Sequence, residues 1–391
     1  MAKIGLPEII ISFKTQSTSA IVRSARGTGV LILNDSNVTS GFKYYKVDDV
    51  TDMPDGLTDA NKDLINKALM GTPYRLHVYA IPMPGENVTV NQATILKEIK
   101  DAKWNYICHP TGTTTDQTDL ADWIADQRQD RSKTFKAVVA AGLNAQTGKS
   151  KVDNYGVINF TTGNIKVENP AWTDAVAAGT STANIDQYII YTAAQYTSRI
   201  MGILCGLSLD RSATFYELPE VVSCAGYDDI DAAIDGGQLV LVDEKDGNGV
   251  KIARGVNSLH TTTTNVGDDF RYIKIVSALD MIKDDIRDTF SKYYCGKIIN
   301  DYSGKMMFVS AVMIYLNNLK GNVLDASEGA LNYVEIDVDA NRDYAQLHGV
   351  QDVSLMTKSQ LEKVNTGVNL YLRGVITPVN CLECLYVNFT L

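Results

Sequence analysis

The stretch with the strongest suggestion of chemistry is Leu143–Ser150, which follows an apolar strand pattern and ends in Gly-Lys-Ser. A phosphate-binding loop has the form G-x-x-x-x-G-K-[S/T] and is followed by a helix whose N-terminus faces the phosphates. Here Leu143 stands where the first glycine is needed, and Gly142 comes one residue too early. Residues 151–160 have the pattern of a turn and a strand. We therefore interpret this stretch as a surface loop.

Two cysteines form a C-x-x-C spacing, which is typical of a redox pair or of half a zinc site. A redox pair usually opens a helix, whereas this pair lies between two strand patterns. A zinc site needs a second pair at suitable spacing, and none follows. The pair is Cys381 and Cys384. We expect the cysteines to be reduced and mostly buried, and we predict no metal and no cofactor.

The other residues that could act in catalysis are four histidines and two acidic pairs. His77 lies within a strand pattern, and His109, His260 and His348 lie near loops, without the G-x-S-x-G elbow of a serine hydrolase. The acidic pairs could bind a cation, but we expect the first to cap a helix and the second to lie on the polar face of a helix. These pairs are Asp268-Asp269 and Asp284-Asp285, both expected to be solvated carboxylates. No catalytic motif remains, so the sequence does not predict an enzyme.

The composition is that of a folded globular protein, with 391 residues, 45% hydrophobic and 21% charged. A formal net charge of −10 disfavours nucleic-acid binding, because phosphate affinity comes from clustered Lys and Arg. The N-terminus lacks the basic and apolar regions of a signal peptide, and the longest apolar runs are too short to span a bilayer. We therefore expect a protein that is made in a cytoplasm and does not insert into a membrane.

The first part of the chain alternates strand and helix patterns, which predicts a parallel sheet with helices on its faces. Strands are expected at 29–33, 75–81, 104–108 and 135–140, and helices at 59–70, 90–100 and 116–128. Residues 142–188 are turn-rich, and Ala175–Ala183 is expected to be a surface loop or small insertion. The α/β pattern then resumes, with helices at 192–205 and 230–235 and strands at 238–243 and 250–253.

After residue 264 the periodicity becomes that of long helices. Apolar residues recur at helical spacing from Ile275 to Tyr293 and again from Phe308 to Leu319. Strands are expected at 333–338 and 368–377. This part is therefore predicted to be an α+β domain.

Both ends of the chain have short strand patterns with no neighbouring strand to complete a sheet. Ile9, Ile11 and Phe13 share one face at the front, and Leu385, Val387, Phe389 and Leu391 alternate with polar residues at the back. An unpaired strand is suited to pairing with another chain, so the ends predict a subunit of a polymer. A short polar linker follows the first strand, at Thr15, Gln16, Ser17, Thr18 and Ser19.

Five segments together resemble contractile tail sheath proteins, and the compact sheaths of PBSX-like prophages and diffocin-type R-type bacteriocins are the closest group. These segments are Ile4–Pro7, Val157–Thr162, Tyr196–Gly202, Ile252–Leu259 and Asn365–Gly367, and they span nearly the whole chain in the same order. The resemblance implies a subtilisin-like α/β domain without its catalytic residues at 21–262, with the insertion near 142–188. It also implies a C-terminal α+β domain at 263–377 facing a tail tube, and strand arms at 1–20 and 378–391.

The resemblance implies a structural role in a contractile injection system. The expected partners are further copies of the chain in stacked hexameric rings, a tail tube protein, and baseplate and tail terminator proteins. The sheath would contract from a metastable extended state and drive the tube through a target cell envelope. The particle, a phage tail or a bacteriocin, would be assembled in a bacterial host and released on lysis.

The terminal strands would then be donated to neighbouring subunits. The donated residues would be Ile9, Ile11, Phe13, Leu385, Val387, Phe389 and Leu391, with Thr15–Ser19 as a hinge linker. The accepting strand would carry Leu370, Leu372 and Ile376. The alternative for the C-terminal strand is a hairpin that folds back onto 368–377 of its own subunit. The alternative for the whole protein is a cytoplasmic, nucleotide-dependent α/β enzyme with a helical accessory domain.

Overall fold

The computed structural model describes residues 27–85, 88–245 and 249–388, which fall into two compact units. The α/β unit comprises the described residues up to Asp280 together with 380–388, and the C-terminal unit comprises residues 281–379. The division falls inside helix α7 (Ile273–Thr289). The predicted N-terminal strand and the linker Thr15–Ser19 lie outside the described residues.

The α/β unit is built on a six-stranded sheet in the order β2-β3-β1-β4-β5-β6. All neighbouring strands in it are parallel except β2, which is antiparallel to β3. The predicted parallel sheet is therefore confirmed. The strands are β1 (Thr28–Asn34), β2 (Lys43–Val47), β3 (Arg75–Ile81), β4 (Tyr106–Cys108), β5 (Lys136–Val139) and β6 (Val157–Asn159).

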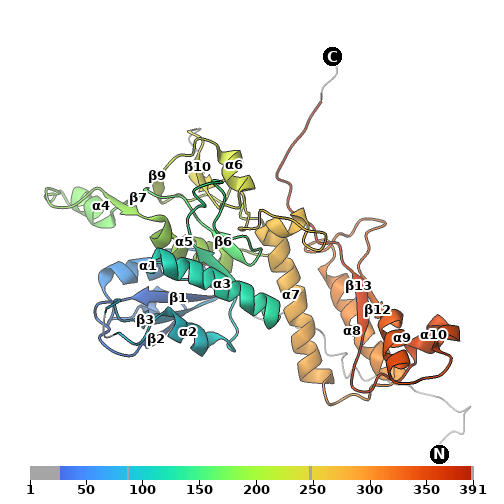
Figure 1. The fold of residues 1–391 in the computed structure, drawn as a ribbon. Helices are drawn as coiled ribbons and strands as arrows, with labels where there is room; N and C mark the ends of the chain where they lie inside the picture. The colour runs from blue at the N-terminus through green and yellow to red at the C-terminus, as the bar shows by residue number, and fades with distance from the viewer. Residues whose placement is uncertain (1–26, 86–87, 246–248, 389–391) are drawn as a thin grey trace, which may run out of the picture. The chain divides into compact units, whose positions relative to one another are not determined.

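The side chains of β1 alternate between the two faces of this sheet, and each face packs against its own helices (Figure 1). Leu31 and Leu33 pack in one core with α1 (Asp59–Leu69) and α5 (Ala193–Gly206). Val30 and Ile32 pack in the other core with α2 (Gln92–Ile99) and α3 (Thr114–Asp130). Because both faces are covered, the central strands are apolar throughout, as expected for a parallel sheet.

Three of these helices begin with reciprocal capping boxes. The pairs that exchange side-chain and backbone hydrogen bonds are Asn91 with Thr94, Thr113 with Asp116, and Thr192 with Gln195. Each box satisfies N–H groups that a helix start leaves without partners. The observed helices start at Gln92, Thr114 and Ala193, each within two residues of the starts predicted at 90, 116 and 192.

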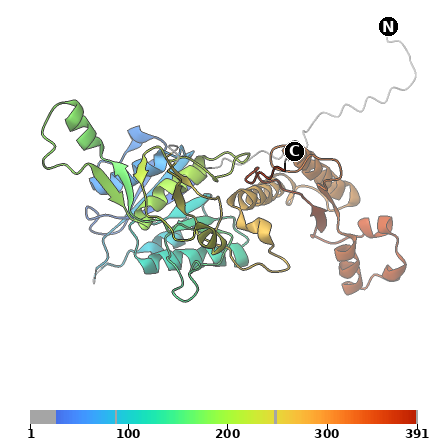
Figure 2. The ribbon, with the colours of Figure 1, turned by 90° about the horizontal axis from the view of Figure 1, so that it is seen from above.

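The segment predicted to be turn-rich contains regular structure. Strand β7 (Ile165–Glu168) lies between β8 (Tyr188–Tyr191) and β9 (Val221–Ser223) in a three-stranded antiparallel sheet. Helix α4 (Pro170–Ala177) follows β7 and projects from the rest of this unit in both views (Figure 2). The start of the predicted loop Ala175–Ala183 is thus the last turn of α4. The prediction missed β7 because its alternation lasts only four residues.

The α/β unit is completed by short elements. These are η1 (Val50–Asp52), α6 (Ile230–Asp235), the antiparallel pair β10 (Leu241–Asp243) and β11 (Val250–Ile252), and η2 (Asp268–Arg271). The strand predicted from Gln238 begins only at Leu241, since the Gln238 and Leu239 N–H groups donate to the carbonyls of Ala233 and Asn159.

The C-terminal unit contains the second half of α7, a π-helical turn, α8 and a two-stranded antiparallel sheet (Figure 1). The two long helices that the sequence predicted are confirmed. The elements after α7 are the π-helix Phe290–Tyr294, α8 (Tyr302–Leu319), β12 (Tyr333–Ile336), α9 (Val338–Leu347), η4 (Val353–Leu355), α10 (Lys358–Glu362) and β13 (Leu372–Val375). Among the described residues no helix is long and apolar enough to cross a membrane.

The expectation that Asp284 and Asp285 are both solvated is wrong for Asp285. Its side chain is fully buried and accepts a hydrogen bond of 2.7 Å from the Tyr315 hydroxyl of α8. Asp284 pairs with Arg287 one helical turn later at 2.6 Å. Two adjacent residues on a helix point about 100° apart, and here Asp285 points toward Tyr315 of α8 while Asp284 reaches Arg287 on its own helix.

Candidate functional site: strand edges and the C-terminal segment

The Gly-Lys-Ser stretch folds as a closed loop. Leu143 and Ser150 form an antiparallel bridge, and the Asn144 N–H donates to the carbonyl of Lys149 at 2.8 Å. The buried Ser150 hydroxyl accepts from the Val152 N–H at 3.1 Å and from the Asn159 amide at 2.9 Å. Its oxygen is thus engaged within the fold, and the described residues 151–156 that follow it form no helix. The prediction of a surface loop is confirmed.

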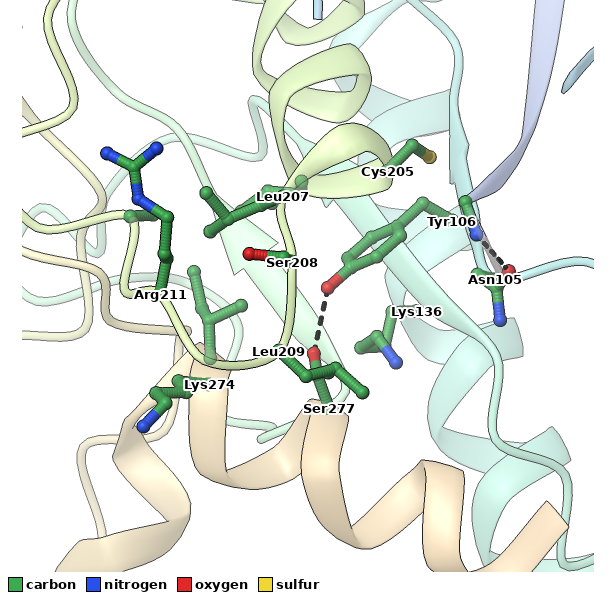
Figure 3. A pocket seen from close by; sticks show the side chains of 14 residues that line it. Asn105, Tyr106, Lys136, Cys205, Leu207, Ser208, Leu209, Arg211, Lys274 and Ser277 are labelled. Atoms are coloured by element: carbon green, nitrogen blue, oxygen red, sulfur yellow. Dashed lines mark hydrogen bonds between the residues drawn. The ribbon is translucent and has the colours of Figure 1, made fainter. Parts of the chain in front are cut away.

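A small cavity in the α/β unit brings together several reactive residue types (Figure 3). The Tyr106 hydroxyl and the Ser277 hydroxyl are hydrogen-bonded at 3.0 Å, and the Lys136 ammonium pairs with Asp280 at 2.9 Å. Burial raises the pKa of the Cys205 thiol to about 12, so it is protonated at neutral pH. The cavity measures about 60 Å³, whereas small-molecule sites usually span about 300–1,000 Å³. This arrangement supports packing and not substrate binding.

The histidines are dispersed. His109 is buried, its Nδ1 lies 2.7 Å from the Gln92 side-chain oxygen, and burial lowers its pKa to about 4. His77 contacts the Tyr44 hydroxyl at 2.7 Å, and His348 stacks on Tyr344. All six cysteines are free, and no group of three metal-ligating side chains occurs in the described part of the chain.

The C-terminal segment is exposed beyond Cys384. Leu385, Tyr386 and Val387 are 86%, 90% and 53% exposed, and residues 385–388 form no strand. Phe389 and Leu391 lie outside the described residues.

The predicted accepting strand is shorter than expected. Leu372 is the first residue of β13 and pairs with Ile336 of β12, whereas Leu370 precedes the strand and Ile376 follows it. In the described residues β13 pairs only with β12, so one edge of β13 has no strand beside it. Such an edge can accept a further strand.

An apolar hollow lies next to β13 in the C-terminal unit. Leu370 and Val368 line a cavity of about 320 Å³ together with two residues of the π-helical turn, Phe290 and Tyr294, and with Ile298–Asn300. Val368 and Ile299 are 95% and 80% exposed, which leaves large apolar side chains uncovered in the isolated chain. Val368 was predicted only as the first residue of the accepting strand 368–377, and Ile299 was not predicted as part of this surface. The available signal was an apolar residue directly after the turn Asn365-Thr366-Gly367.

Comparison with solved structures first defines the class of fold. A sheath tail protein of Desulfitobacterium hafniense is 18% identical and aligns with a TM-score of 0.62 over 81% of this chain and 91% of its own. The sheath complex of the extracellular contractile injection system PVC, in its contracted state, is 12% identical with a TM-score of 0.65 over 100% and 98%. The fold is that of tail sheath proteins.

Sequence comparison gives the family. The phage tail sheath C-terminal domain matches residues 265–391. The tail sheath protein of Clostridium phage phiCD119 is 30% identical over 394 residues, which cover 98% of this chain and 99% of that protein. This chain therefore belongs to the phage tail sheath proteins, which are structural, and the predicted resemblance is confirmed. The alternative of a nucleotide-dependent enzyme gains no support from these relatives.

Proposed function

We propose that this protein is the sheath subunit of a phage tail or a related particle, polymerising in stacked hexameric rings around an inner tube. The chain-long match to a tail sheath protein carries this proposal. The sheath contracts from a metastable extended state and drives the tube through a target envelope. Its further partners are the tube protein, the baseplate and the tail terminator. Its α/β unit would be a subtilisin-like domain without catalytic residues.

Strand donation is the proposed link between subunits. The exposed apolar residues Leu385 and Val387 alternate in the way a strand requires, and β13 has an edge without a strand beside it. The C-terminal segment of one subunit would add to β13 of another, with its apolar side chains over Leu370 and Leu372. The N-terminal residues Ile9, Ile11 and Phe13 would be donated in the same way.

Such links are individually weak and collectively strong. About four backbone hydrogen bonds, each with a net value of roughly 0.5–1.5 kcal/mol, give a few kcal/mol per donated strand. Two arms per subunit in a closed ring act multivalently, so the assembly persists while other contacts rearrange. Contraction can then draw on contacts that are larger in the contracted state, without nucleotide hydrolysis.

Electron microscopy of the purified protein tests the proposal. We expect rings or tubes of uniform width. Uniform small particles whose melting temperature rises on addition of ATP would favour the nucleotide-dependent enzyme instead.

Face-specific substitutions test strand donation. Leu385→Asp with Val387→Asp places charges on the proposed buried face, whereas Tyr386→Asp with Asn388→Asp places the same charges on the opposite face. We expect the first variant to fold and to lose tube formation, and the second to assemble. Deletion of 385–391 should behave like the first variant. Normal tubes from the deletion variant would show that this strand is not donated.

A further inference from the structure

The side chain of Glu383 is buried although it lies in a mostly exposed segment. Its side chain is 7% exposed, while the neighbouring Leu382 is 101% exposed and Leu385 is 86% exposed. Burial of a carboxylate is unfavourable unless charged or hydrogen-bonding partners surround it. A specific site on the α/β unit must therefore receive this side chain.

Both carboxylate oxygens of Glu383 have partners from distant parts of the chain. The Ser212 hydroxyl donates to Oε1 at 3.0 Å, and the Thr214 hydroxyl donates to the same oxygen at 2.7 Å. The Arg254 guanidinium donates from Nε to Oε2 at 2.9 Å. We call Ser212, Thr214 and Arg254 the carboxylate socket. Two hydroxyls and a guanidinium satisfy a carboxylate well, because bonds to an ionised acceptor are the stronger ones.

The socket residues are themselves held in place. The Thr214 N–H donates to Ser212 Oγ at 3.2 Å, and the Gly255 N–H donates to Thr214 Oγ1 at 2.9 Å. The Arg254 guanidinium carbon lies 5.5 Å from the centre of the Tyr272 ring. Burial alone would lower the pKa of Arg254, but its bond to Glu383 raises that pKa above the usual value. The socket is thus a fixed feature of the α/β unit.

We propose that the carboxylate socket anchors the C-terminal segment at Glu383, so that the strand donated to a neighbouring subunit begins only after Cys384. Glu383 is then a positioning residue for strand donation. This inference rests on the proposed sheath function, and it goes beyond that function by fixing where the arm leaves its own subunit.

The anchor limits how far the arm can reach. An arm free from Pro378 onward would span up to about 50 Å to Leu391, whereas residues 385–391 span at most about 25 Å. The accepting edge of the neighbour must therefore lie within about 25 Å of the socket. An arm released from the socket would be longer and less directed, which lowers the effective concentration of the strand at its acceptor.

The alkylation rate of Cys381 shows whether Glu383 is bound in the socket, and it can be measured on the unassembled protein. The Cys381 thiol is half-buried and donates to the Asp210 carbonyl at 3.4 Å, so Cys381 is protected while Glu383 stays bound. The exposed Cys295 serves as an internal reference. In the unassembled Glu383→Ala variant we expect Cys381 to react roughly tenfold faster than in the wild type, or more. The reason is that the hydrogen bonds from the carboxylate socket to Glu383, which hold the segment in place, are lost. Leu382→Ala, a change at an exposed neighbour, should leave the rate unchanged.

A charge exchange then connects the anchor to assembly. Glu383→Arg and Arg254→Glu should each release Cys381 and reduce tube formation, and the double variant should restore both. The proposal is overturned if Cys381 stays protected in both single variants, or if the single variants form tubes as well as the wild type. If the wild type forms no tubes, the proposed sheath function fails instead, while the alkylation rates still decide whether the anchor exists.

Discussion

Asp280 lies between two cations inside the α/β unit. Arg128 of α3 binds its carboxylate with two bonds of 2.8 and 3.0 Å, and the Lys136 ammonium of β5 lies 2.9 Å from one of its oxygens. All three side chains are at most 7% exposed. Such a cluster is sensitive to the loss of one member, because the remaining charges stay buried without compensation.

We predict that Asp280→Asn lowers the free energy of unfolding by about 3–5 kcal/mol. Denaturant unfolding followed by circular dichroism measures this change. Asp59→Asn is the control, since Asp59 is fully exposed and pairs with Lys62 one helical turn later. A surface pair of this kind contributes about 0–1 kcal/mol. Equal effects of the two substitutions would contradict the prediction.

The charged cluster around Asp280 makes the folding stability depend on pH. Burial alone would raise the pKa of Asp280, but Lys136 and Arg128 lower it below its usual value. The stabilisation is therefore complete above the unfolded-state pKa, about 3.9, and is lost as pH falls through the lower folded-state pKa. We expect the difference in stability between the wild type and Asp280→Asn to be constant near neutral pH and to shrink below about pH 4.

Substitution of Lys149 tests the alternative hypothesis of a nucleotide-dependent enzyme. Its loop is closed by backbone bonds and by the Ser150 hydroxyl, and Lys149 takes part through its carbonyl. We predict that Lys149→Ala changes stability by less than about 0.5 kcal/mol and leaves tube assembly unchanged. Ser150→Ala, which removes a buried acceptor, should be the more destabilising change. Loss of both ATP binding and contraction in Lys149→Ala would revive the enzyme hypothesis.

The close approach of α1 and α5 depends on small residues. A methyl group on Gly202 would overlap the carbonyl of Ala68, and one on Gly206 would overlap the carbonyl of Gly71. Gly202 ends one of the segments that carried the family resemblance, Tyr196–Gly202. Only glycine lets the two backbones lie this near to each other.

We predict that Gly202→Ala destabilises the α/β unit by about 1–3 kcal/mol or more, the usual cost of overpacking. This cost exceeds the gain of roughly 1 kcal/mol that alanine brings to a helix. The melting temperature measures it. Gly226→Ala is the control, because a methyl group there meets no atom within 4 Å. A stabilised Gly202→Ala variant would mean that the helices can separate without cost.

The sequence predicted some elements well because their signal is local. Strand β3 was predicted with its observed bounds, since Arg75–Ile81 alternates strongly between turn signals. Strand β2 was missed, because Lys43–Val47 is largely exposed at the sheet edge and carries little periodicity. The carboxylate socket was not predictable in this way. Ser212 and Glu383 lie 171 residues apart, and neither has a pattern that depends on the other.

At the scale of the whole molecule, the family resemblance succeeded where single motifs failed. Its segments are spread over nearly the whole chain, and several have structural roles that the fold explains. Val157–Thr162 contains β6, and Ile252–Leu259 contains the socket residue Arg254. In the proposed sheath, contraction would move the subunits while the donated strands keep neighbouring subunits connected.

The linker Thr15–Ser19 offers a test of that connection. It lies outside the described residues, and its small polar side chains follow the proposed donated strand. If displacement of one subunit pulls its neighbour through this linker, added slack should uncouple the rings while strand donation still occurs. Three Gly/Ser residues inserted after Ser17 add roughly 10 Å of reach. We predict that extended sheaths carrying this insertion assemble on tubes but stall in contraction.

Triggered particles imaged by electron microscopy measure the outcome as the fraction that is fully contracted. The matched control is the same insertion after Ser181, an exposed residue in the loop after α4, which should contract like the wild type. Failure to assemble only in the Ser17 variant would mean that the linker length is needed to build the sheath. Full contraction at the wild-type rate would show that this linker does not transmit the motion, and the carboxylate socket with its C-terminal strand would then be the remaining tether between subunits.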